Sequence, residues 1–302
     1  MTDDSDEDII RISTMFVDLF MGICQDLVQL WMSLAVSYHQ RYLREVSSLG
    51  LQFYNDCCFM AHHLVALSIA TNHGDALITD NVRRRMAEQG AVRYLWLIQM
   101  VEPLKALGKR FFVHHLHNQR ETILRSLRIT NQFRNVESAA VKEEIEQSFS
   151  ESLISISQFM ASSRSTIPDK VLFKIGGRLL ECICGRVVDQ VMQRIDAAEH
   201  SDIGINAAHN ISLIIRTVTK FELLSNDYPY MTRSIDKTWR QFTYLGLILD
   251  RDCNLLLLTK ELNKGSLDVF EKQALIKLVC AIWSESSKRA AMVRKIEARF
   301  SK

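Results

Sequence analysis

Residues 141–160 read VKEEIEQSFSESLISISQFM, and this stretch decides the fold class. Its apolar residues recur every three or four positions, namely Val141, Ile145, Phe149, Leu153, Ile156 and Met160. Charged residues occupy the other side, namely Lys142, Glu143, Glu144 and Glu146. Apolar residues at this spacing form one stripe along an α-helix, so the stretch predicts an amphipathic helix.

The same periodicity extends through most of the chain. A second stripe repeats every four residues at Ile175, Leu179, Ile183, Val187, Val191 and Ile195. The 302 residues include only 3 prolines and 11 glycines, which are too few for a sheet with many tight turns. The sequence contains neither an alternating run long enough for a sheet nor a repeat of fixed period. It therefore predicts an all-α protein of about ten helices in antiparallel bundles.

Loop-forming residues separate the expected helices. The first helix is expected from Asp6 or Asp8 to about Ser47, and the second from about 49 to 70. A third is expected from about 80 to 101, where Pro103 stops it or starts the next helix, which reaches about 131. Later helices are expected between loops at 199–204, 225–229 and 263–266, with a final pair at about 267–283 and 286–300.

The polar segment at residues 162–168, SSRSTIP, is the predicted domain boundary because it is rich in turn formers and ends in proline. We expect an N-terminal helical bundle at 1–165 and a C-terminal helical bundle at 166–302.

The composition excludes several classes of protein. Hydrophobic residues make up 47% of the chain and charged residues 24%, which is typical of a globular protein. A net charge of +2 provides no global field for nucleic acid or acidic lipid. Seven cysteines without framework spacing predict reduced, buried thiols and a cytoplasmic location. The first residues do not resemble a signal peptide, and charges interrupt the apolar stretches 15–36 and 244–258, so no membrane insertion is expected.

One short stretch contains residues that could bind a metal. Cys58 and His62 are four positions apart, so on a helix they share a face and could be two ligands of a zinc site. A remote histidine could complete the site, namely His114, His115 or His117. However, the ligand pairs of zinc folds are closely spaced, and helix bundles readily bury cysteine and histidine. A structural role is favoured, so no metal or other cofactor is expected, and a metal- or thiol-dependent helical enzyme remains the alternative.

Catalytic residues are not predicted anywhere in the chain. Cys182 and Cys184 would point about 200° apart on a helix, which disfavours both a disulfide and a shared metal. The sequence contains no nucleophile elbow, no phosphate-binding glycine loop and no H-E-x-x-H. Gly176 and Gly177 within a helical stripe predict a close approach between two helices. We therefore expect a protein that is not an enzyme.

Basic residues cluster at Arg83, Arg84 and Arg85 and in the last helix. The basic residues of that helix are Lys288, Arg289, Arg294, Lys295 and Arg299. Its expected packing side consists of Ala290, Val293, Ile296 and Phe300. A basic outer face and an apolar inner face favour docking of an acidic protein partner. Nucleic-acid binding by the basic tail is a further alternative, which the near balance of acidic and basic residues disfavours.

Residues 53–64 read FYNDCCFMAHHL and carry a resemblance to a known family. This stretch is similar to the Phe-x-Asn-Asn/Asp-Cys-x-Tyr/Phe-x-Ala-His-His-Leu signature of the zeste-white-ten proteins, with Cys58 and Met60 at its variable positions. Residues 274–277, ALIK, and 288–296, KRAAMVRKI, resemble the closing helices of the family. Residues 177–180 and 195–199 fit the preceding helix more loosely. Family members are longer, so the chain resembles their C-terminal half.

The resemblance implies a fold and a function for the chain. Such proteins are elongated helical-rod subunits of multisubunit tethering complexes, without catalysis or cofactor. One implied assembly is the ER tether that receives Golgi-derived vesicles in retrograde transport together with SNARE proteins. The other is the kinetochore complex that recruits dynein and serves the mitotic checkpoint. The implied partner of the C-terminal half is a large solenoid subunit of the rough-deal or neuroblastoma-amplified type, and the implied locations are the cytoplasm, the periphery of the ER membrane and the kinetochore in mitosis.

The signature is expected to be structural. Phe53, Cys57 and Leu64 fall near one helical face with His62 at its edge, so we expect these four to be buried and to hold two helices together, with His62 paired. The complete set of signature residues is Phe53, Asn55, Asp56, Cys57, His62, His63 and Leu64.

Overall fold

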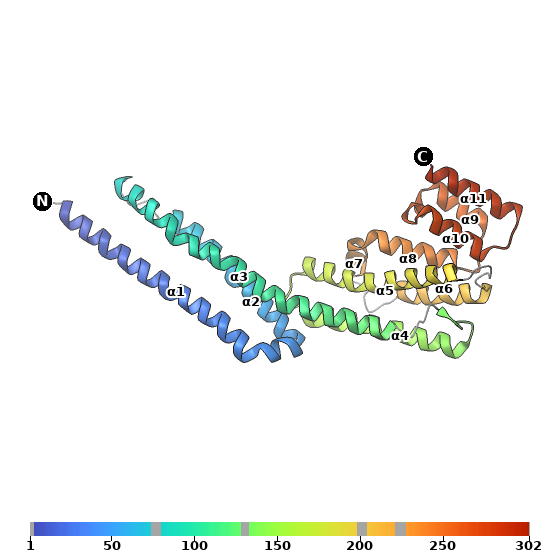
Figure 1. Cartoon of the computed structure of the whole chain (residues 1–302), viewed down its shortest axis with the longest axis horizontal. Coiled ribbons are helices and arrows are strands. Elements are labelled where there is room, and N and C mark those ends of the chain that lie inside the picture. Colours follow the sequence, from blue (N-terminus) through green and yellow to red (C-terminus); the bar gives the residue numbers. More distant parts are fainter. Residues whose placement is uncertain (1–2, 74–79, 128–132, 198–203, 221–227, 302) are drawn as a thin grey trace. The chain divides into compact units, whose positions relative to one another are not determined.

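The computed structural model describes residues 3–73, 80–127, 133–197, 204–220 and 228–301 (Figure 1). Within these ranges the chain is helical and contains no strand, which confirms the all-α prediction. None of the helices in these ranges is long and apolar enough to cross a bilayer. The chain divides into two compact units, residues 1–117 and 118–302.

The first unit contains α1 (Asp3–Glu45), α2 (Ser47–His73) and the greater part of α3 (Asp80–Ser126). The chain reverses at Val46, so α1 and α2 pack against each other in opposite directions (Figure 1). The side chains of residues 67–96, including Arg83–Arg85, lie outside the described residues.

Pro103 lies inside the continuous helix α3, so the prediction that it separates two helices is wrong. Proline removes one backbone hydrogen bond and usually kinks or ends a helix. Here both sides of the proline are anchored in the core of the first unit, because Met100, Val101 and Leu104 are buried. Val101 and Leu104 pack against Ala61 of α2, and this packing offsets the lost hydrogen bond.

The second unit begins with the end of α3 and continues with α4 (Ala139–Ser163), α5 (Asp169–Ala197) and α6 (Ile205–Thr219). It then contains α7 (Tyr228–Ser234), α8 (Asp236–Ile248), α9 (Leu255–Asn263), the 3₁₀ turn η3 (Ser266–Val269), α10 (Lys272–Ile282) and α11 (Ser287–Phe300). The central helix of this unit is α5, which contacts α4, α7, α8 and α10.

The two apolar stripes predicted from the sequence form much of the core of the second unit. Every residue of the α5 stripe is buried, and so is every residue of the α4 stripe except the half-buried Val141. A Cβ atom added to Gly177 would clash with Ser234 Oγ and would lie 2.8 Å from the carbonyl oxygen of Met231. The predicted close approach at Gly176 and Gly177 is therefore confirmed, and the neighbouring helix is α7.

The structure divides between residues 117 and 118, whereas the sequence predicts a boundary between 165 and 166. Residues 164–168 form the turn between α4 and α5. Because α4 packs on both α5 and α6, this turn lies inside the second unit. A polar, proline-closed turn looks the same in the sequence whether it joins two domains or two helices of one bundle.

Candidate partner-binding surfaces

Phe53 of α2 lies at the centre of an aromatic cluster in the first unit. Its ring stacks on Trp31 of α1 with centroids 5.3 Å apart and meets the ring of Phe111 of α3 edge-on at 5.4 Å. Leu43 and Cys57 complete the buried group. Phe53 therefore joins all three helices of the unit, as a structural role of the signature predicts.

Cys57 is fully buried where α2 and α3 approach closely. A Cβ atom added to Gly108 of α3 would lie 2.8 Å from Cys57 Cβ, so glycine is needed for this spacing. Burial, reinforced by the neighbouring Cys58 and Asp56, raises the pKa of the Cys57 thiol to about 12. The thiol is therefore protonated near neutral pH and is a poor nucleophile.

The outward side of the signature differs from the expectation. His62 is exposed, so the prediction that it is buried is wrong, and Leu64 is only half-buried. Asn55, Asp56 and His63 are also exposed. The position of His62 at the edge of the apolar face did not decide its burial, because α1 and α3 cover only the side that carries Phe53, Cys57 and Ala61.

The metal hypothesis for Cys58 and His62 has no supporting geometry among the described residues. No three histidine, cysteine, aspartate or glutamate side chains come together there as a metal site requires. His115 is turned inward, with Nε2 2.6 Å from the carbonyl oxygen of Leu43. Burial lowers the pKa of its imidazole, so His115 is a neutral core residue that ties α3 to the end of α1.

The cysteine pair on α5 also has structural roles. Cys184 is fully buried, and burial raises the pKa of its thiol well above the ordinary value. Cys182 donates a hydrogen bond to the carbonyl oxygen of Arg178 at 3.3 Å, and burial raises its pKa as well. Both thiols are free.

The basic helix of the second unit is α11, drawn in red in Figure 1. Its N-cap is Ser286, whose side chain accepts a hydrogen bond from the backbone N–H of Arg289 at 3.2 Å. Such a cap satisfies one of the free donors of the first turn. Met292 and Ile296 are its buried residues, whereas Ala290 of the expected packing side is exposed and Val293 and Phe300 are half-buried.

Two of the five predicted partner-binding cations have partners within the chain. Arg289 donates to the carbonyl oxygens of Trp283 at 3.0 Å and Cys280 at 3.4 Å, which satisfies the C-terminal end of α10. Arg299 donates two hydrogen bonds to the carboxylate of Asp268, from Nε to Oδ1 at 3.2 Å and from Nη2 to Oδ2 at 2.6 Å. This hydrogen bonding lowers the pKa of Asp268.

The other three cations are exposed and have no hydrogen bond or ion pair to any described residue, namely Lys288, Arg294 and Lys295. Lys288 and Lys295 both lie beside a groove of about 630 Å³ between α9 and α11. Leu256, which is 68% exposed, and Ala291 are among the apolar residues that line the groove. Arg294 is not part of this lining, because it lies about 100° around the helix from Lys295.

The sequence missed the contribution of α9 to this surface. Leu256, Leu255 and Thr259 line the groove together with Met292 of α11, whose sulfur lies 3.4 Å from the Thr259 hydroxyl. The exposed leucine at the start of a short, leucine-rich helix was the available signal. An exposed leucine alone does not indicate a binding surface, and only the packing of α9 beside α11 places Leu256 at the edge of a groove. We refer to this lysine-flanked surface as the α9–α11 groove.

Comparison with known proteins identifies relatives of the chain. Residues 8–125 match the family model described as "Centromere/kinetochore protein zw10, C-terminal". The chain is also 21% identical over 292 residues to the centromere/kinetochore protein zw10 homolog of Mus musculus. That alignment covers 93% of this chain and 35% of the mouse protein, so the chain spans about a third of the length of this curated relative.

Proposed function

We propose that this chain, whose residues 8–125 match the C-terminal family model of the zw10 proteins, is a member of that family and a non-catalytic scaffold subunit of a protein complex. The complex is an ER–Golgi retrograde vesicle-tethering complex, the kinetochore checkpoint complex, or both. The partner of this chain is a large helical solenoid subunit, which links it indirectly to SNAREs and dynein. The protein acts in the cytoplasm at the periphery of the ER membrane and at the kinetochore in mitosis.

The observation that carries the proposal is the α9–α11 groove with its two unpaired lysines. An exposed lysine contributes little to fold stability, because even a well-formed surface ion pair contributes about 0–1 kcal/mol. Lys288 and Lys295 lie two helical turns apart beside an apolar floor that includes Leu256, Ala291 and Met292. An amphipathic helix fits this arrangement, with apolar side chains in the groove and a carboxylate opposite each lysine.

The state of the thiols supports a role without chemistry. A thiol-dependent enzyme requires a thiolate, which forms readily only where the pKa is lowered. Burial instead raises the pKa of Cys57 to about 12 and that of Cys253 to about 11. Complete burial also raises the pKa of the Cys184 thiol. These side chains fill the core, as the non-catalytic proposal requires.

The test begins by identifying the largest subunit that co-purifies with the tagged chain from native lysate. The purified subunit is then measured against the wild type, the double reversal of Lys288 and Lys295 to glutamate, and Arg294→Glu. We expect the double reversal to slow association at low salt by about tenfold or more, because it reverses the field at the groove. It should also speed dissociation.

Arg294→Glu is the matched control, since it changes the charge of the same helix outside the groove. It should slow association slightly, by long-range repulsion, and should leave the dissociation rate unchanged. Unchanged kinetics for the double reversal, or equal effects of both variants on dissociation, would refute docking in the groove. Circular dichroism should be the same for all three proteins, since the substituted side chains are exposed.

A further inference from the structure

Helix α1 has a second apolar face that the contacts of the first unit do not use. Towards α2 and α3, α1 presents Val28, Trp31, Met32, Ala35 and Leu43. Eleven other large side chains of α1 are between 42% and 74% exposed. Met15, Leu19 and Tyr42 lie to either side, and the other eight form one stripe: Ile12, Phe16, Phe20, Ile23, Leu27, Leu30, Leu34 and Tyr38. We call these eight residues the α1 seam.

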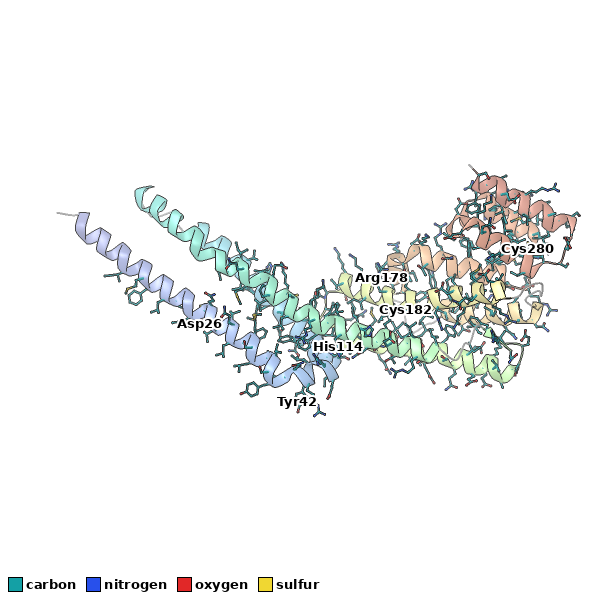
Figure 2. The ribbon with its side chains drawn as sticks, viewed as in Figure 1. Asp26, Tyr42, His114, Arg178, Cys182 and Cys280 are labelled. Carbon is teal, nitrogen blue, oxygen red and sulfur yellow. The ribbon has the colours of Figure 1, made fainter. Side chains whose placement is uncertain are left out.

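The seam is one narrow stripe. At about 100° per residue, its members fall within an arc of about 80°, centred about 120° from the face that contacts α2 and α3. It is about 39 Å long, at 1.5 Å of rise per residue. In Figure 1 the side of α1 away from α2 and α3 is uncovered, and Figure 2 shows side chains projecting from that side.

The spacing of the seam is symmetric about Gln25. Ile23 and Leu27 lie two positions from this midpoint, and Phe20 and Leu30 lie five positions from it. Phe16 and Leu34 lie nine positions away, and Ile12 and Tyr38 lie thirteen positions away. Two identical helices packed in opposite directions across Gln25 would therefore place each seam residue opposite another seam residue. A two-fold symmetric contact requires this self-complementarity.

The charges along α1 favour the same antiparallel arrangement. The sequence places five acidic residues at positions 3–8, whereas Arg44 and Arg41, the latter ion-paired with Glu45, lie near the other end of the helix. Asp6 and Arg44 are equally far from Gln25, so antiparallel copies bring acidic and basic ends together. Parallel copies would instead place acidic ends side by side, where like charges repel.

The area of the seam is sufficient for a stable dimer. At about 100 Å² for each half-exposed large side chain, the seams of two copies bury about 1,600 Å², the usual size of a specific interface. A membrane surface fits the seam less well, because interfacial helices are rich in lysine and arginine. The first turns of α1 are acidic instead.

We infer that the chain forms an antiparallel homodimer through the α1 seam, with its two-fold axis near Gln25. This inference concerns the first unit and is independent of partner docking in the α9–α11 groove. The wild-type 302-residue chain should sediment as a dimer over a concentration range of about 1 to 100 µM.

The first variant replaces both Phe16 and Leu34 with glutamate. Because these positions face each other in the dimer, the change buries like charges, and the dissociation constant should rise at least about 100-fold. The two side chains are 62% and 42% exposed in the single copy, so the helix content should not change. The melting temperature should fall only by the part that dimerisation contributes.

The second variant, Phe16→Glu with Leu34→Lys, distinguishes antiparallel from parallel pairing. In the antiparallel dimer each glutamate faces a lysine of the other copy, so dimerisation should recover to within about tenfold of wild type. In a parallel dimer identical charges would meet, and both variants would fail equally. Phe59→Glu, at a 62% exposed position of α2, is the control and should remain dimeric.

Three results would overturn the inference. The first is a wild type that is monomeric throughout the concentration range and does not float with vesicles. The second is a charge-paired variant that dimerises as weakly as the double-glutamate variant. The third is a monomeric wild type that floats with phosphatidylserine-containing vesicles, which would make the seam a membrane-binding face.

Discussion

Phe53→Ala would empty the aromatic cluster that joins α1, α2 and α3. The ring of Phe53 is 7% exposed and contacts both Trp31 and Phe111. Truncating a buried phenylalanine to alanine usually costs about 3–5 kcal/mol of unfolding free energy. Each aromatic pair that is lost accounts for about 0.5–1.5 kcal/mol beyond the buried area.

The surroundings of Phe53 place the expected cost near the lower end of this range. Phe53 and Trp31 both line an open groove of about 470 Å³ between α1 and α2. Water can enter the vacated space from this groove, so part of the cavity term is avoided. We therefore expect a loss of about 3 kcal/mol from the first unit.

Urea unfolding followed by circular dichroism gives the free energy, and hydrogen exchange of peptides from α1 to α3 assigns the loss to the first unit. Phe59→Ala is the matched control on the same helix, because Phe59 is 62% exposed and should cost less than about 0.5 kcal/mol. A loss below about 1 kcal/mol for Phe53→Ala, or equal losses for the two variants, would refute the structural role of the signature. Wild-type stability combined with loss of a partner would make the signature an interface.

Two further predictions concern the packing of α5 and the titration of His115. Gly177→Ala should cost about 1–3 kcal/mol, since its Cβ atom would clash with Ser234 of α7. Gly185→Ala on the same helix has open space around its Cβ atom and should be neutral or stabilising by up to about 1 kcal/mol in the same melting assay. His115 has a pKa lowered by burial, so the folded state disfavours its charged form. The first unit should therefore lose stability as the pH falls below about 6.5, the ordinary histidine pKa, and on through the lower pKa of the folded state. His115→Gln should weaken this pH dependence of the unfolding free energy. A variant with the same pH dependence as wild type would contradict the assignment.

The signature shows which burial states the residue pattern predicts and which it does not. Its spacing correctly placed Phe53 and Cys57 on the buried face of a helix, because helical periodicity is a local property of the backbone. The same pattern placed His62 at the boundary of that face, where burial depends on how far the neighbouring helices extend around α2. They leave His62 exposed.

The basic helix shows the same limit for charged residues. Five cations looked equivalent in the sequence, yet Arg289 closes the end of α10 and Arg299 binds Asp268. These roles depend on residues that lie 6 and 31 positions away along the chain. Only the folded structure separates them from Lys288 and Lys295, which remain unpaired beside the groove.

The sequence by itself determined the helical class, most helix positions and the residues of the α4 and α5 core stripes. These features follow from apolar spacing and from the scarcity of proline and glycine, which act over one or two helical turns. Only the tertiary structure decided that α3 continues through Pro103, that the units divide at 117/118 and that one face of α1 stays uncovered. Each of these depends on contacts between helices far apart in the chain, and a local pattern of residues carries no information about which distant surface it will meet.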